Sequence, residues 1–439
     1  MAQPLGTIRA LRSALANDTT TPARLARAAL ANANQNPGRN TYLWQDEAWT
    51  MAEAERAGQL PRTEGGPFGD GRPILWGLPV SVKDCFDLAG SATSCGTAFY
   101  RDLNGIAQHD SWIVERLRAE GAVLIGKTHL HPLAYGITGE NPEFGDCLQP
   151  GKDRALTGGS SSGACASVME GSAVAAIGTD TGGSVRVPAA LCGLAGYRAS
   201  LGRGGWRGGA HLAQSFDTLG WLFSDIEEAP LLASFFTGQE PAHIRAFTRF
   251  AIVHDDFLHD CEPAILKEYR KTVADLESLG LTSATIDVAW WSDAQEIFAA
   301  IQAWEAAGLH RGNFDRFESS IRDRLAWGER ITPEEITSLR QRHEAFKSRM
   351  DELFDRHELL MLPAAPVARL EAGADHSNTR KRLLRYTAPI SLAGAPAVTI
   401  PCAAGGMQMA AGREFDEALL QLVALLGARR KASESVLNS

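Results

Sequence analysis

Two serines each follow a pair of glycines in one stretch of the chain, Gly158-Gly159-Ser160 and Gly182-Gly183-Ser184. Glycine pairs let a backbone approach a substrate closely and turn its N–H groups toward it. Between them, the small residues 164–169 predict a short helix and the apolar residues 173–177 predict a buried strand. If this helix and strand fold back on each other, they could bring both glycine-rich loops to the same end of a sheet. A helix predicted directly after Ser184 would help the loop amides to stabilise an oxyanion beside that serine.

A serine nucleophile needs a base. No histidine stands close to either serine in the sequence, so another residue has to act as the base. The preceding sequence offers Lys83, at the end of a predicted strand in residues 77–84 that alternates and is partly apolar. Lysine acts as a general base only when it is neutral. We therefore expect Lys83 to lie where desolvation or nearby cations lower its pKa.

Several ordered motifs together resemble the amidase signature family. They are residues 77–84, 121–128, 158–163, 178–189, 193–198 and 215–220. The alternation of helices with short buried strands independently indicates the α/β class. The resemblance implies the amidase signature fold, a large mixed β-sheet covered by helices on both faces. It also implies hydrolysis of the C–N bonds of linear amides, and we extend this expectation to carbamates (urethanes) and esters.

By that resemblance, a catalytic triad consists of Lys83, Ser160 and Ser184. Ser184 would be the nucleophile, and Ser160, which follows a cis peptide bond in the family, would relay the proton to Lys83. The resemblance further implies an oxyanion hole from backbone amides and two residues that brace the loop. The amides are those of Thr181, Gly182, Gly183 and Ser184, and the bracing residues are Asp180 and Arg186. No metal or organic cofactor is expected.

Substrate contacts are assigned to Gly136, Ser161 and Trp206. Trp206 is the large apolar residue of the glycine-rich residues 200–215, which predict a mobile loop. That loop is interpreted either as a lid or pocket wall, or as a plain surface loop.

Two further motifs suggest other chemistry. Residues 121–128 match the P-loop pattern, but the four residues between the glycines predict a strand and Pro132 interrupts the helix that should follow. Residues 159–163 match the Gly-x-Ser-x-Gly elbow of α/β-hydrolases with Ser161 as nucleophile. The polar residues 152–157 before it differ from the buried strand that this elbow requires. An α/β-hydrolase esterase is kept as a distant alternative.

A nearer alternative lies within the same family. The glutamine-hydrolysing component of glutamyl-tRNA amidotransferase, its A-type chain, resembles this chain in its triad, and it releases ammonia from glutamine within a complex. The divergence of residues 230–355 favours a self-sufficient amidase instead.

Composition limits the partners. The net charge of −9 argues against non-specific nucleic-acid binding. No apolar run reaches the roughly 18 residues of a membrane-spanning helix. Seven cysteines without a Cys-x-x-Cys pair predict free thiols, and with no secretory leader pattern we expect a cytoplasmic protein. The expected partner is a small amide or carbamate, and the expected state is a monomer or homodimer.

The whole chain, residues 1–439, is interpreted as one domain. Its motif-bearing core covers about 60–225 and 357–430, and a variable helical insertion covers about 230–355. The insertion is expected to supply part of the substrate pocket.

Overall fold

One mixed sheet runs through the computed structural model, which describes residues 5–35, 37–61, 68–236 and 246–437. Its 11 strands lie in the order β1-β3-β2-β4-β6-β5-β10-β11-β9-β7-β8. The strands are β1 (Tyr42–Trp44), β2 (Pro79–Lys83), β3 (Val123–Thr128), β4 (Ala175–Asp180), β5 (Ala195–Arg198), β6 (Thr218–Phe223), β7 (Arg249–Val253), β8 (Thr282–Ile286), β9 (Leu359–Pro363), β10 (Ala397–Pro401) and β11 (Gly406–Ala411).

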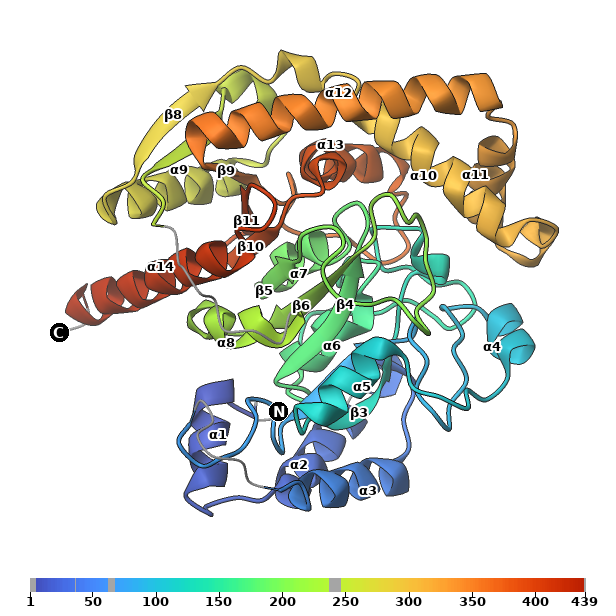
Figure 1. The fold of residues 1–439 in the computed structure, drawn as a ribbon, viewed down its shortest axis with the longest axis vertical. Helices are drawn as coiled ribbons and strands as arrows, with labels where there is room; N and C mark the ends of the chain where they lie inside the picture. Colours follow the sequence, from blue (N-terminus) through green and yellow to red (C-terminus); the bar gives the residue numbers. More distant parts are fainter. Residues whose placement is uncertain (1–4, 36, 62–67, 237–245, 438–439) are drawn as a thin grey trace.

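Helices surround this sheet (Figure 1). They are α1 (Ile8–Ala16), α2 (Pro22–Asn34), α3 (Glu47–Gly58), α4 (Ala98–Asn104), α5 (Trp112–Ala119), α6 (Ser162–Met169), α7 (Arg186–Cys192), α8 (Ala229–Ala233), α9 (Pro263–Ser278), α10 (Ala294–His310), α11 (Ser319–Glu329), α12 (Pro333–His357), α13 (Ser377–Ala393) and α14 (Asp416–Leu437). α10 to α13 lie together at the top of the view, and α1 to α3 lie at the bottom. No helix in the described ranges is long and apolar enough to cross a bilayer.

The sheet is parallel within β3-β2-β4 and within β9-β7-β8, and antiparallel in its middle and at the edge strand β1. β2 runs parallel to both β3 and β4, and β7 runs parallel to both β8 and β9. The run from β4 through β6, β5, β10 and β11 to β9 is antiparallel. Every residue of β2, β3, β4 and β6 is buried, as expected for strands covered on both faces. The predicted α/β class and mixed sheet are confirmed.

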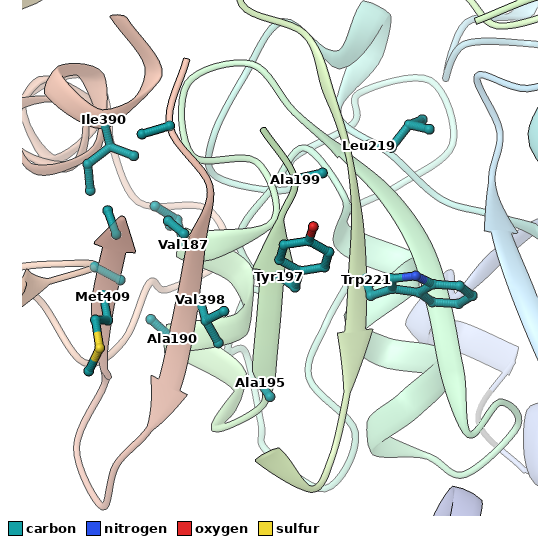
Figure 2. Close-up of a cluster of buried hydrophobic side chains, with 14 of the residues drawn as sticks. Val187, Ala190, Ala195, Tyr197, Ala199, Leu219, Trp221, Ile390, Val398 and Met409 are labelled. Atoms are coloured by element: carbon teal, nitrogen blue, oxygen red, sulfur yellow. The ribbon is translucent and has the colours of Figure 1, made fainter. Parts of the chain in front are cut away.

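A row of large side chains crosses the middle of the sheet (Figure 2). Trp221 on β6 pairs with Tyr197 on β5, Tyr197 with Val398 on β10, and Val398 with Met409 on β11. All four side chains are buried. Such cross-strand pairs stabilise a sheet and set its register. The register of β6 matters for function because β6 also pairs with β4, whose end carries the loop before Ser184.

Residues 230–355 contain strands as well as helices. α10 and α12 match the helical patterns predicted there, and Thr332 and Glu335 form a capping box at the start of α12. β7 and β8, however, extend the same sheet beyond β9. The sequence did not predict β8, because its residues (TSATI) are short, polar and partly exposed.

Candidate active site

Two strand ends and two helix starts meet at one place in the fold. Lys83 is the last residue of β2, Ser160 stands just before α6, and Ser184 stands just before α7. The Ser161 amide donates a hydrogen bond to the Ser184 carbonyl oxygen at 3.2 Å. This bond joins the two glycine-rich loops directly. The prediction that they lie at the same end of the sheet is confirmed.

Lys83 is fully buried among hydroxyl groups. Its Nζ lies 2.7 Å from Ser160 Oγ, 2.7 Å from Thr179 Oγ1 and 3.2 Å from Ser161 Oγ. No described carboxylate forms an ion pair with it. Burial lowers the pKa of Lys83 to about 8, because desolvation outweighs the attraction of more distant negative groups. Lys83 is therefore neutral far more often than an ordinary lysine near physiological pH, although the charged form still predominates.

The two serines of the predicted triad have different surroundings. The Gly159–Ser160 peptide bond is cis, and Ser160 is fully buried with its hydroxyl against Lys83. Ser184 is 5% exposed and lines a small pocket. Among the described residues, its hydroxyl has no hydrogen-bond partner. The Ser184 hydroxyl is therefore free to meet a substrate, whereas the Ser160 hydroxyl contacts the lysine.

Asp180 organises the turn between β4 and α7. Its carboxylate accepts hydrogen bonds from the amides of Gly183, Val185 and Arg186, at 2.8 to 3.2 Å. It also pairs with the buried guanidinium groups of Arg186 and Arg198 at 3.0 and 2.9 Å. Although burial opposes ionisation, the two arginine charges hold the pKa of Asp180 well below its ordinary value. Asp180 and Arg186 thus occupy positions suited to bracing the loop.

The backbone amides of this turn are not all equivalent. The Gly183 amide donates to Asp180 Oδ1, so it is already used. The amides of Thr181, Gly182 and Ser184 form no backbone or side-chain hydrogen bond within the described chain. Of the four amides assigned to the oxyanion hole from the sequence, three therefore remain free to donate a hydrogen bond to a substrate. Sequence reasoning could not distinguish them, because the difference depends on the direction of one carboxylate.

The turn packs against the helices that follow residue 230. A Cβ on Gly182 would lie 2.6 Å from the Phe298 ring of α10, and one on Gly183 would lie 2.9 Å from Thr387 of α13. Thr387 Oγ1 donates to the Gly182 carbonyl at 2.6 Å. Glycine is required at both positions because neither neighbour leaves room for a side chain, and Gly183 also has a φ of +118°.

The pocket at Ser184 is small, with a volume of about 20 Å³, which is room for about one water molecule. It is lined by Ala134, Tyr135, Gly136, Ile137, Gly182, Ser184, Gln302, Arg380 and Leu384. Two cavities of about 660 and 650 Å³ lie elsewhere and include none of the three triad residues. We take the small pocket as the reaction site because it alone among these three holds Ser184.

The structure separates the three predicted substrate contacts. Gly136 lines the Ser184 pocket. Ser161 is fully buried, and its hydroxyl lies between Lys83 Nζ and the Thr179 carbonyl, away from the pocket lining. Trp206 stacks on His211 with ring centroids 4.4 Å apart, and it is absent from that lining as well.

The loop that carries Trp206 is attached to its neighbours. The Gly208 carbonyl accepts a hydrogen bond from the Asp87 amide, and the Ala210 amide donates to the Cys85 carbonyl, both at 2.8 Å. These bonds connect the loop to the segment just after Lys83. None of residues 200–215 lines the Ser184 pocket, so the lid or pocket-wall interpretation and the surface-loop interpretation both stay predictions.

Sequence reasoning missed three residues of this site. Thr179 receives a hydrogen bond from Lys83, and its place in the Gly178-Thr179-Asp180 motif was the available signal. Gln302 on α10 and Arg380 on α13 line the pocket. No recognised motif covers either of them, because their position depends on how distant helices pack on the sheet.

The structure does not support the chemistry that the two alternative motifs suggested. Lys127 of the P-loop pattern is buried in β3 and forms an ion pair with Asp84 at 2.6 Å. No described strand precedes Ser161 in residues 150–160, so the elbow of an α/β-hydrolase is wrong.

Comparison with known proteins finds similar chains over most of this sequence. The amidase family model matches residues 24–420. Indoleacetamide hydrolase of Pseudomonas savastanoi is 31% identical, covering 98% of this chain and 96% of that protein. The A-type chain of glutamyl-tRNA(Gln) amidotransferase from a Cyanothece strain is 26% identical over 91% of each chain. A crystal structure of an amidase superposes with a TM-score of 0.85 at 27% identity, covering 97% of this chain and all of that one.

Proposed function

Since the chain belongs to the amidase family, we propose that it is a self-sufficient serine hydrolase in which Ser184 attacks the carbonyl of a linear amide. The protein is a hydrolase that acts on C–N bonds other than peptide bonds. The observation that carries the proposal is the contact of Lys83 with Ser160, in a loop that the Ser161–Ser184 hydrogen bond joins to the loop of Ser184. This arrangement provides a base, a relay and a nucleophile without histidine.

In the first step, the Ser184 hydroxyl turns toward Ser160 as its oxygen attacks the substrate carbonyl carbon. The Ser184 proton passes to Ser160 Oγ while the Ser160 proton passes to neutral Lys83 Nζ, 2.7 Å away. Catalytic hydrogen bonds often tighten only when substrate is bound, so the open position of Ser184 is compatible with this step.

The tetrahedral intermediate carries a negative oxygen. We assign its stabilisation to the amides of Thr181, Gly182 and Ser184, which have no other acceptor among the described residues. Each donor of this kind contributes roughly 2.7–4 kcal/mol in comparable oxyanion holes. The Asp180 network holds the turn in place and so orients these amides before the substrate arrives.

The leaving nitrogen needs a proton before the C–N bond breaks. Lys83, now charged, returns the proton through Ser160 to this nitrogen, and an acyl enzyme on Ser184 remains. Water then attacks the acyl carbon by the same proton route in reverse. Esters and carbamates present the same carbonyl, so we propose that the site accepts them too.

A fluorophosphonate probe tests the nucleophile directly. Mass spectrometry of the labelled protein should locate the probe on Ser184, and Ser184→Ala should remove both the label and amide hydrolysis. Ser91→Ala is a control, because Ser91 is a buried serine away from the pocket. A label on any serine other than Ser184 in the wild-type protein contradicts the proposal.

The similarity to an A-type amidotransferase chain supports a second candidate, the release of ammonia from glutamine within a complex. The two differ in what the purified chain does alone. A self-sufficient amidase, as a monomer or homodimer by light scattering, hydrolyses amides without any added partner. Activity that appears only with partner proteins, and with glutamine, favours the second candidate.

A further inference from the structure

We propose that the Ser184 pocket selects small amides that carry a carboxylate, which Arg380 binds. The inference rests on the proposed function of Ser184, because it concerns the substrate of that site. Arg380 lies in the first turn of α13 and lines the pocket together with Ser184 and Gly182. It is the one arginine in that lining, and the lining contains no aspartate or glutamate.

Arg380 has no acidic partner in the described part of the chain. The other arginines of the same helix differ: Arg382 and Arg385 both pair with Asp260, at 3.2 and 2.9 Å. The guanidinium of Arg380 is half-buried and makes no described side-chain hydrogen bond. Burial lowers the pKa of Arg380, although Tyr135 and Glu318 oppose this shift. A cation in this position is costly unless an anion joins it.

A second cation increases the positive charge at this pocket. Arg324 on α11 lies over the Tyr135 ring at 4.2 Å and donates to backbone carbonyls, with no described carboxylate partner. Burial and the charge of Arg380 lower the pKa of Arg324 to about 9, so it remains charged at neutral pH. The charge of Glu318 raises the pKa of both arginines, but its carboxylate forms no described ion pair with either and accepts hydrogen bonds from the amides of Ser320 and Ile321.

A carboxylate fits the hydrogen-bond donors of Arg380. A guanidinium offers planar, paired donors that match the two oxygens of a carboxylate. A carboxylate bound to Arg380 would neutralise a half-buried charge and hold the amide beside Ser184, so the same contact would provide affinity and orientation.

Matched substrates test the inference. Succinamate and 4-methylpentanamide differ mainly in a carboxylate against an isopropyl group, and N-acetylglycine and N-isobutylacetamide make the same comparison on the leaving-group side. We expect kcat/KM for the anionic member of at least one pair to exceed the neutral member by about tenfold or more. Arg380→Gln should reduce this ratio by about tenfold. Lys381→Gln, the same charge change at the exposed neighbouring residue, should leave the ratio unchanged.

A second readout does not depend on turnover. Succinate should slow the labelling of Ser184 by the fluorophosphonate probe, and Arg380→Gln should weaken this protection while Arg380→Lys restores part of it. Thermal unfolding checks that each variant is folded. Equal rates for both members of each substrate pair, or equal protection by succinate in wild type and Arg380→Gln, overturns the carboxylate inference. If Ser184 is still labelled in that case, the proposed function stands. A wild-type protein without any label on Ser184 overturns the proposed function itself.

Discussion

Asp217 Oδ1 accepts a hydrogen bond from Thr181 Oγ1 at 2.6 Å. The other oxygen of Asp217 accepts from the amides of Leu212 and Ala213, at 2.9 and 3.0 Å, and contacts His211 Nδ1 at 3.0 Å. One buried carboxylate therefore ties the end of the glycine-rich segment to the turn that precedes Ser184. The Thr181 amide is one of the three unoccupied donors of that turn. We expect the hydrogen bond between the Thr181 side chain and Asp217 to help orient this amide.

Replacing Asp217 by asparagine should impair the chemical step more than substrate binding. The change keeps the size of the side chain but removes its charge and replaces one accepting oxygen. We expect kcat to fall by about 10- to 100-fold, less than the full loss of an oxyanion donor, while KM changes by less than about threefold. Steady-state kinetics measures both quantities. A rise in KM with kcat unchanged would show that Asp217 acts on binding instead.

The pH dependence should report the lysine. The proposed mechanism requires neutral Lys83, and burial lowers its pKa to about 8. Deprotonation increases as pH rises, so kcat/KM should climb about tenfold per pH unit below pH 8 and level off above it. The profile is measured with an amide under conditions where chemistry limits the rate. A flat profile from pH 5 to 9 contradicts the assignment of Lys83 as the base.

Lys83→Met should affect amides more than activated esters. Methionine fills most of the buried volume of the lysine, but it can neither accept the Ser184 proton nor return it. An amide needs its leaving nitrogen protonated, whereas an activated ester does not. We expect the loss in kcat/KM for an amide to exceed the loss for a p-nitrophenyl ester with the same acyl group by at least about tenfold. Equal losses would remove the general-acid part of the mechanism.

The parts of this site that could be predicted from sequence are those that local patterns encode. Lys83 ends an apolar strand, and the two glycine pairs flank a helix and a strand, so these residues could be assigned from short segments. The apolar run of residues 173–177 also located the buried β4. The single sheet that continues from β4 through β9 to β8 supports the proposal of one domain.

The contacts that could not be predicted join residues far apart in the chain. Arg380 reaches the pocket only because α13 packs on the turn after β4, through Thr387 and Gly182. Asp217 reaches Thr181 across 36 positions. Hydrogen bonds between residues far apart in the chain depend on how helices and strands pack together. The periodicity and composition of the sequence do not specify this packing. The pairing of the short, polar β8 with β7 is missed for the same reason.

Asp180→Asn should destabilise the whole protein. The buried carboxylate neutralises Arg186 and Arg198, so its removal leaves two buried guanidinium groups without their counter-ion. Breaking a buried ion pair in this way typically costs about 3–5 kcal/mol of unfolding free energy. Urea unfolding followed by circular dichroism measures the change. Asp102→Asn is the control, since its pair with Arg101 is exposed and should contribute less than about 1 kcal/mol. Similar midpoints for both variants would contradict the bracing role.

Gly136→Ala should disturb the pocket through His131. A Cβ on Gly136 would lie 2.1 Å from His131 Nε2, so the buried imidazole has to move. The amide of His131 donates to the Ser160 carbonyl at 3.2 Å, and a shift of this residue would reach the relay serine. We expect kcat/KM to fall by at least about tenfold and stability to fall by about 1–3 kcal/mol.

Gly308→Ala provides the matched control for that variant. Gly308 lies within α10, and a Cβ there meets no atom within 4 Å. Alanine inside a helix is more favourable than glycine by about 0.5–1 kcal/mol, so this variant should be slightly stabilised and fully active. Thermal unfolding and amide hydrolysis are measured side by side for both variants. If Gly136→Ala retains wild-type activity, the His131 ring can move without disturbing Ser160, and the pocket wall is more tolerant than its close packing indicates.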